Sequence, residues 1–193
     1  MQGRTAEGLE HLYHQLQEYE KSDFYPYHMP GHKRRLNGCM PQQIMGMDIT
    51  EIDGFDNLHD ANGILKDLQE EAARLYGAEE SFYLVNGSTC GILSAISAAL
   101  PAGGHLLMAR DCHKSVYHGV YLRNLTTSYL YPDWVPGYDI HDAITPDQVM
   151  KALEQEPDIG AVLIVSPTYE GRIADVGEIA RIVHEKEIGR AHV

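Results

Sequence analysis

Three short segments of the sequence combine glycine, hydroxyl and imidazole residues in a way that could bind an anion or move a proton. The first, Asn86–Gly91, follows an apolar run and opens a predicted helix. Backbone N–H groups at a helix start and the helix dipole favour a phosphate, and the hydroxyls of Ser88 and Thr89 add donors beside Gly87. Since the segment matches neither the Walker pattern nor G-x-G-x-x-G, it suits one phosphate group. The alternative is that Ser88 or Thr89 only caps the helix.

The other two segments also lie between a predicted strand and a predicted helix. Arg110–Ser115 carries His113, whose imidazole could lie against a flat ring or transfer a proton near neutral pH. Because the chain has 11 histidines, His113 could equally be a surface residue at a helix start. Ser166–Gly171 offers the hydroxyls of Ser166 and Thr168, and its alternative interpretation is a turn built by Pro and Gly.

The elements that must position these segments follow from the hydrophobic periodicity. Helices are predicted at 5–20, 62–77, 88–100, 114–123, 145–154 and 175–187, and strands at 81–85, 105–109, 127–131 and 160–165. The helix at 88–100 is small and apolar, so we expect it to be buried. Strands that alternate with helices indicate a mostly parallel sheet, in which ligands bind beyond the carboxyl ends of the strands. Residues 22–59, punctuated by Pro and Gly, are predicted to form an extended arm.

Composition restricts the class of protein. The 193 residues carry 15 Lys and Arg against 28 Asp and Glu, a formal charge of −13, which argues against nucleic-acid binding. No apolar run has the roughly 20 residues of a membrane helix, and no secretory signal is recognised at the N-terminus. The three cysteines, Cys39, Cys90 and Cys112, lack C-x-x-C spacing, so we expect free thiols and a cytoplasmic location.

Metal binding is not expected from the acidic residues. Asp48, Glu51, Asp53 and Asp56 crowd one segment, but their spacing is not that of an EF-hand. A solvated loop, or one that recognises an amine substrate, is the better interpretation.

Six motifs in order resemble the ornithine/lysine/arginine decarboxylases, pyridoxal-phosphate enzymes of the aspartate-aminotransferase fold, type I. The resemblance runs from about residue 24 to about residue 186. The motifs are Pro30-Gly31-His32-Lys33, Asp48-Ile49-Thr50-Glu51-x-x-Gly54-x-Asp56, Gly77-Ala78-Glu79, Asn86-Gly87-Ser88-Thr89-x-Gly91, His113-Lys114-Ser115 and Ser166-Pro167-Thr168-Tyr169-x-Gly171.

This resemblance implies a three-layer α/β/α fold with a mostly parallel sheet. Residues 61–187 would form part of the cofactor-binding major domain, after an N-terminal helix and arm at 1–60. It also implies a basic amino acid as substrate, pyridoxal 5′-phosphate as cofactor, no metal, and a homodimer or larger assembly.

Individual roles follow from the same resemblance. Gly87, Ser88 and Thr89 would hold the cofactor phosphate, and His113 would stack on the pyridine ring as a catalytic residue. Ser166 or Thr168 would lie near the ring's edge. His32 and the acidic segment 48–56 would help to shape the active site, with a dimer interface as one arrangement.

The sequence also departs from the family pattern. The family's Asp-x-Ala-His acid and Ser-x-His-Lys lysine are not found, and Lys33 belongs to the arm motif instead. Residues 188–193 break the pattern, so we expect a non-native tail and a fragment that is inactive by itself. Two alternatives stay open: another enzyme of this fold, such as an aminotransferase or carbon–sulfur lyase, or a non-catalytic chain that binds cofactor or a partner.

Overall fold

The computed structural model describes residues 7–34, 42–186 and 188, and its contacts divide the chain into one compact unit up to Tyr83 and another from Leu84. Cys39, Glu187 and residues 189–193 of the predicted tail lie outside the described residues. Each unit is built around its own packed elements, so each is described separately.

The first unit contains α1 (Glu7–Lys21), α2 (Gln42–Gly46), the short 3₁₀ helix η1 (Leu58–Asp60) and α3 (Ile64–Tyr76). The predicted helices at 5–20 and 62–77 are confirmed by α1 and α3. Gly77 ends α3 with a φ of 67°, a left-handed conformation that glycine adopts without strain. α3 packs against α1, and Tyr19 meets the buried ring of Phe55 edge-on at 5.4 Å between centroids.

Polar and ring contacts order the described part of the predicted arm. The guanidinium of Arg34 lies 4.1 Å above the ring of Tyr19, whose hydroxyl is 2.5 Å from Nε2 of His28. Lys33 Nζ donates to the carbonyl of His28 at 2.7 Å. The arm is therefore fixed mainly by side chains that reach back to α1 and to its own backbone, with α2 and η1 as its only regular pieces among the described residues.

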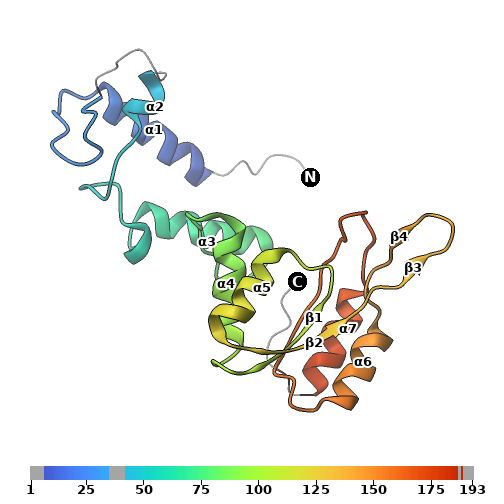
Figure 1. The fold of residues 1–193 in the computed structure, drawn as a ribbon. Helices are drawn as coiled ribbons and strands as arrows, with labels where there is room; N and C mark the ends of the chain where they lie inside the picture. The colour runs from blue at the N-terminus through green and yellow to red at the C-terminus, as the bar shows by residue number, and fades with distance from the viewer. Residues whose placement is uncertain (1–6, 35–41, 187, 189–193) are drawn as a thin grey trace. The chain divides into compact units, whose positions relative to one another are not determined.

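The second unit is an α/β layer structure, which confirms the predicted fold class (Figure 1). A parallel sheet of three strands runs in the order β2-β1-β5, and α4 and α5 lie on the opposite side of it from α6 and α7. The elements are α4 (Gly87–Ala99), β1 (His105–Ala109), α5 (Lys114–Arg123), β2 (Thr126–Leu130), β3 (Trp134–Val135), β4 (Ile140–His141), α6 (Pro146–Gln155), β5 (Ala161–Leu163) and α7 (Val176–Glu185).

The central strand β1 lies in the middle of the hydrophobic core of the second unit. All five of its residues are buried, and Leu107 and Met108 have no exposed surface. Val149 of α6 and Val183 of α7 are likewise fully enclosed. A continuous apolar strand of this kind is what a parallel sheet covered on both faces requires.

The predicted strand at 81–85 is wrong. The segment forms no strand, and Phe82 and Val85 are 70% and 68% exposed. An apolar segment becomes a strand only where a neighbouring edge offers hydrogen-bonding partners, and no strand among the described residues pairs with this one.

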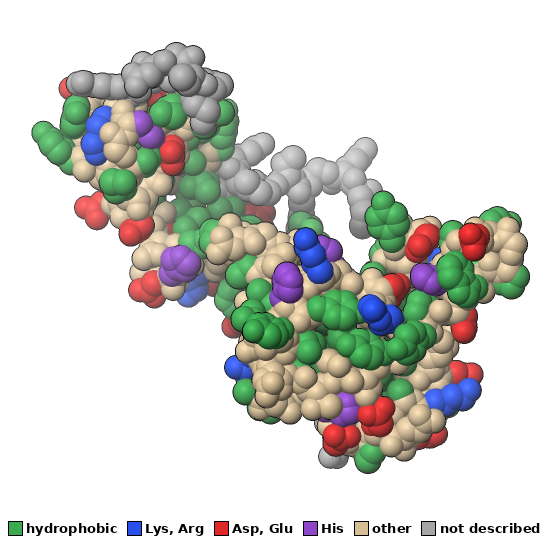
Figure 2. Space-filling view, viewed as in Figure 1, with side chains coloured by type: hydrophobic (Ala, Val, Ile, Leu, Met, Phe, Trp, Pro, Cys, Tyr) green, Lys and Arg blue, Asp and Glu red, His purple; other side chains and the backbone are tan. Residues whose placement is uncertain are grey.

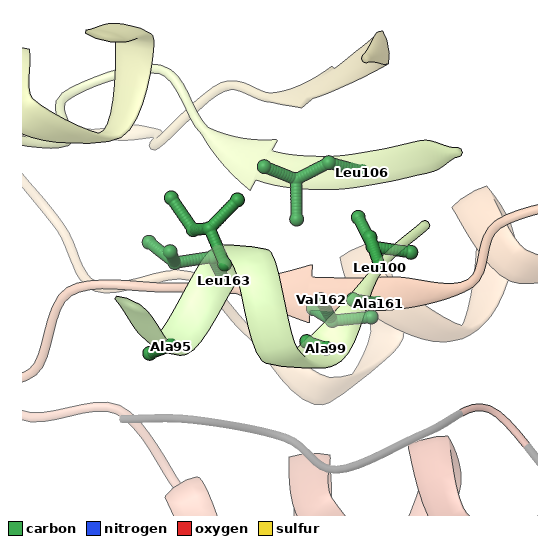
Figure 3. A pocket seen from close by; sticks show the side chains of 8 residues that line it. Ala95, Ala99, Leu100, Leu106, Ala161, Val162 and Leu163 are labelled. Carbon is green, nitrogen blue, oxygen red and sulfur yellow. The ribbon is translucent and has the colours of Figure 1, made fainter. Parts of the chain in front are cut away.

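The predicted burial of helix 88–100 is also wrong. Within α4 only Ile96 is buried, and Leu100 follows it at the C-cap. One side of α4 packs on α5, while another borders a small apolar groove beside β1 and β5 (Figure 3). Small side chains such as Ala95 and Ala99 leave this groove open.

The hairpin of β3 and β4 was not predicted, although Pro136-Gly137 between them is a recognised turn signal. Gly137 takes a φ of 80° in that turn. Among the described residues, no helix is both long and apolar enough to cross a membrane.

Candidate functional site

The packing of α4 and α5 brings their N-termini to one edge of the sheet. Arg123 at the end of α5 donates from Nη2 to the carbonyl of Leu100 at 3.0 Å and accepts from Gly103 N at 3.0 Å. These contacts lie just before β1, at the amino ends of the strands. Since the two helices pack side by side and end together, both begin toward the carboxyl ends of the strands, where parallel sheets bind ligands.

The start of α4 is open. Its N-cap, Asn86, makes no side-chain capping hydrogen bond, and Gly87, Ser88 and Thr89 are exposed. Gly87 takes a φ of 68°, and nothing lies within 4 Å of the place where a Cβ would be. The N-cap of α4 is thus Asn86 and not Ser88 or Thr89, and no side chain among the described residues caps the first backbone N–H groups.

His113 sits at the start of α5. It is the N-cap residue and is exposed, and its Nδ1 accepts from the backbone N–H of Ser115 at 3.2 Å. An acceptor at Nδ1 means that the neutral ring carries its proton on Nε2. This placement agrees with a surface histidine at a helix start and also leaves the ring face open, so its stacking role stays a prediction.

Ser166 and Thr168 follow β5, which lies next to β1 in the sheet, so their loop emerges beside that of His113. Ser166 Oγ accepts from Ala174 N at 3.1 Å, and Thr168 Oγ1 accepts from Arg172 N at 3.2 Å. Ser166 is half-buried and Thr168 is buried. Both hydroxyl oxygens thus hold the loop together, as the turn interpretation expects, and any contact with a ring edge stays a prediction.

A positive charge and two aromatic rings lie around the loop that follows β1 and carries His113. Arg110, in the same loop as His113, donates from Nη1 to the hydroxyl of Tyr117 at 2.6 Å, and that hydroxyl donates to the Arg110 carbonyl at 2.7 Å. The guanidinium lies 5.5 Å and 5.8 Å from the ring centroids of Tyr117 and Tyr129. Hydrophobic side chains are visible on the surface of the part that carries α5 and β2 (Figure 2).

Asp142 and Arg172, which the sequence did not single out, support the loop after β5. Arg172 donates from Nε and Nη2 to the two carboxylate oxygens of Asp142 at 2.7 and 3.0 Å. The hydrogen bond and charge of Arg172 lower the pKa of Asp142, and the same pairing raises that of Arg172. Thirty residues separate the two, so no local sequence signal could have revealed the pair.

In the first unit, the arm motif meets the acidic segment. Nε2 of His32 lies 3.2 Å from Oδ2 of Asp48. Asp56 accepts from four backbone N–H groups, those of residues 57, 62, 63 and 65, at 2.8 to 3.0 Å, and these bonds hold its pKa well below the usual range. Asp56 therefore organises the entry to α3 and is not an open carboxylate, while the predicted role of this segment in an active site stays untested. The described residues hold no group of three or more His, Cys, Asp or Glu that could bind a metal.

A family model for the major domain of Orn/Lys/Arg decarboxylases matches residues 10–192. The chain belongs to this family. The resemblance found in its motifs is thereby confirmed, and the match covers both structural units.

Curated relatives of this family member are considerably longer. It is 35% identical over 181 residues to the uncharacterized protein YaaO of Bacillus subtilis, covering 90% of this chain and 37% of YaaO. It is 29% identical to the arginine decarboxylase of Halalkalibacterium halodurans, covering 84% of this chain and 34% of that enzyme. The chain thus spans about a third of the length of these relatives.

Solved structures of two lysine decarboxylases share the fold. The constitutive lysine decarboxylase of Escherichia coli gives a TM-score of 0.74 at 23% identity, covering 89% of this chain and 27% of that chain. Lysine decarboxylase A of Pseudomonas aeruginosa gives 0.70 at 21% identity, covering 83% and 24%. At these identities the likeness establishes the α/β fold of this Orn/Lys/Arg decarboxylase domain and nothing finer.

Proposed function

We propose that this chain is the part of a pyridoxal-phosphate-dependent decarboxylase that binds the cofactor phosphate, and that the whole enzyme acts on a basic amino acid. The observation that carries the proposal is the open, uncapped start of α4 at the same sheet edge as His113. Family membership and the names of relatives, arginine and lysine decarboxylases, supply the reaction and the substrate class.

The residues at the start of α4 fit a phosphate group. Gly87, in a left-handed conformation with no atom near its Cβ position, allows a ligand to approach the backbone closely. The first N–H groups of α4 and the hydroxyls of Ser88 and Thr89 would donate to the phosphate oxygens, and the positive end of the helix dipole would favour their charge.

Bound pyridoxal phosphate would supply an electron sink for the charge left on the α-carbon when the carboxylate departs as carbon dioxide. Residues of this chain would orient the groups around the cofactor and add positive charge near its phosphate. His113 keeps its Nδ1 occupied by Ser115 N–H, which orients the imidazole and leaves Nε2 as the proton-bearing atom. Arg110, held by Tyr117, and exposed Lys114 add positive charge beside the phosphate position.

Ser166 and Thr168 retain a supporting role in this proposal. Their oxygens accept backbone N–H groups, so each hydroxyl proton is left to be donated. We place Ser166, the less buried of the two, nearer the ring's edge.

The remaining parts of the proposal concern the whole protein. Lysine, ornithine and arginine are equally compatible substrates, and we propose a cytoplasmic enzyme that assembles as a homodimer or larger. Because this chain spans about a third of its relatives, we propose that it does not decarboxylate by itself. Carbon dioxide release from arginine, lysine or ornithine by the purified 193-residue chain with added pyridoxal phosphate would contradict that part.

The phosphate site can be tested with pyridoxamine 5′-phosphate, which has no aldehyde and so cannot condense with surface lysines. Titration calorimetry should show binding of this compound by the 193-residue chain and much weaker binding of pyridoxamine, which lacks the phosphate. The double variant S88A/T89A should bind at least about tenfold more weakly, since each lost hydrogen bond to a charged group is worth about 1.5 to 3 kcal/mol.

Ser97→Ala provides a matched control, because Ser97 is exposed on the same helix but lies near its other end. Its affinity should equal that of the unaltered chain. Equal affinities for pyridoxamine 5′-phosphate and pyridoxamine would refute a phosphate site at the start of α4. An equal loss of affinity in S88A/T89A and in S97A would refute it as well.

A further inference from the structure

A cavity in the first unit lies between α3 and the segment that follows it, and the proposed function makes no use of it. Gly77 ends α3 in a left-handed conformation, which lets the chain reverse its direction. The hydroxyl of Tyr83 then donates to the carbonyl of Leu68, in the first half of α3, at 3.2 Å. Residues 79–82 therefore run back beside the helix, and a cavity of about 290 Å³ lies between them and residues 66–73.

The lining of this cavity carries both signs of charge. Three carboxylates, one ammonium group and one phenyl ring line it, those of Glu70, Glu79, Glu80, Lys66 and Phe82. The lysine and the three glutamates are exposed, and no ion pair joins any of them to another described residue. These four charges are therefore available to a ligand that enters the cavity.

The placement of the carboxylates argues against a metal ion in this cavity. The described residues hold no group of three His, Cys, Asp or Glu that could bind one metal, so the three glutamates do not converge on a single point. Carboxylates that stay apart match a ligand whose positive charges are also apart. The ammonium group of Lys66 adds a further condition, because it needs a negative group in the same ligand.

A basic amino acid has this pattern of charges. It carries a carboxylate and an ammonium group at one end and a second cationic group at the other, joined by an aliphatic chain. Nζ of Lys66 would donate to the ligand carboxylate, and the glutamates would accept from its two cationic groups. The aliphatic chain would lie against the ring of Phe82, which is 70% exposed and would lose contact with water. The cavity is at the lower end of the size range of ligand pockets, which suits a small molecule.

We propose that the cavity between α3 and residues 79–82 binds a free basic amino acid. Lys66 holds its carboxylate, and Glu70, Glu79 and Glu80 hold its cationic groups. Each of these contacts is exposed and therefore weak, so we expect a dissociation constant in the millimolar range, and the site fills only when the amino acid is abundant. This inference rests on the charges of the cavity and does not depend on the cofactor or on the proposed reaction.

The ligand class can be tested by NMR titration of the nitrogen-15-labelled 193-residue chain with L-lysine at constant ionic strength. Amides of residues 66–82 should shift together, with a dissociation constant of about 1 mM. L-norleucine, which has the same carbon chain without the second amino group, should bind at least about threefold more weakly. The same loss is expected for 1,5-diaminopentane, which lacks the carboxylate.

Substitutions at exposed positions test the individual contacts without disturbing the core. Glu70→Gln should weaken L-lysine binding about threefold, whereas Asp67→Asn should not change it, because Asp67 is exposed on the same helix but does not line the cavity. Lys66→Gln should weaken binding of L-lysine but not of 1,5-diaminopentane, which has no carboxylate to lose a partner.

Three results would overturn the proposal. Shifts confined to residues 86–91 and 110–115 would place the amino acid at the candidate site of the second unit instead. Binding of 1,5-diaminopentane as tight as that of L-lysine would show that the cavity attracts any organic cation. An equal loss of affinity in E70Q and D67N would show that only the overall negative charge of the chain matters.

Discussion

Arg172 holds Asp142 through two parallel hydrogen bonds, although the residues belong to segments that are far apart in the sequence. Asp142 directly follows β4, and Arg172 closes the loop after β5 that carries Ser166 and Thr168. Within that loop, Thr168 N donates to the carbonyl of Arg172 at 2.8 Å and Gly171 N to the carbonyl of Thr168 at 2.9 Å. The ion pair therefore anchors a compact turn at the carboxyl edge of the sheet to the neighbouring hairpin.

We expect Arg172→Lys to loosen this loop while leaving the rest of the second unit intact. A lysine keeps the charge but cannot form the two-pronged contact. Hydrogen exchange of the amides of Thr168, Gly171 and Arg172 should accelerate, whereas global stability should change little because the pair is exposed. Arg181→Gln is the control, since the ion pairs of Arg181 with described residues, Glu178 and Glu185, both lie within α7. Equal acceleration in both variants would show that the Asp142 contact does not anchor the loop.

Asp56 should make the first unit sensitive to acid. Its four backbone hydrogen bonds stabilise the ionised form and keep its folded-state pKa below the ordinary value of 3.8. A lowered pKa contributes stability above that ordinary value, and the contribution is lost as the pH falls toward the folded-state pKa. The urea midpoint of the chain should therefore drop between about pH 5 and about pH 3, and Asp56→Asn should drop less while being less stable at neutral pH.

Asp53→Asn is the control for this experiment, because Asp53 is an exposed carboxylate three residues earlier in the same segment. It should behave like the unaltered chain at both pH values. A neutral-pH stability of D56N equal to that of D53N would show that the four backbone contacts add nothing.

The sequence predicted those elements whose signals are local. The strand at 105–109 and the helix at 114–123 have the predicted bounds, because a continuous apolar run and a short helical period determine them. The Thr145-Pro146 helix start is confirmed as a full capping box with Gln148. Local chemistry of this kind needs no knowledge of neighbours in space.

Features that depend on distant partners could not be predicted in the same way. The segment 81–85 has strand composition but no partner strand among the described residues, and α4 is apolar but only partly covered. The contacts of His105 with Ser128 and Asp158 join residues 23 and 53 positions apart, and the pair of Asp142 and Arg172 joins residues 30 positions apart, so neither set has a local pattern. At the candidate site, sequence indicated the residues, while structure added that α4 lacks a side-chain cap and that Ser166 and Thr168 hold their own loop.

Shortening a buried side chain at the centre of β1 should lower the free energy of unfolding substantially. Leu107 is fully buried in the central strand, with its neighbours supplied by helices on both faces of the sheet. Leu107→Ala should lower the free energy of unfolding by about 2 to 5 kcal/mol, the sum of lost burial and a residual cavity. Leu122→Ala, at a site that is 66% exposed on α5, should cost less than about 1 kcal/mol. Urea unfolding of both variants measures the difference, and similar losses would contradict the core described for the second unit.

Cys112 should resist alkylation although it adjoins His113. Burial, aided by the charge of Asp111, raises the pKa of the Cys112 thiol to about 12, and the residue is only 8% exposed. At pH 8 roughly one thiol in ten thousand would be ionised, so the reactive thiolate is almost absent. In a Cys39→Ser background, iodoacetamide should modify half-exposed Cys90 first, as followed by mass spectrometry of the tryptic peptides. Adding urea should abolish the difference by exposing both thiols. Equal rates for Cys90 and Cys112 without urea would show instead that the loop leading into His113 opens readily, and that the imidazole is not held as firmly as its hydrogen bonds to Ser115 indicate.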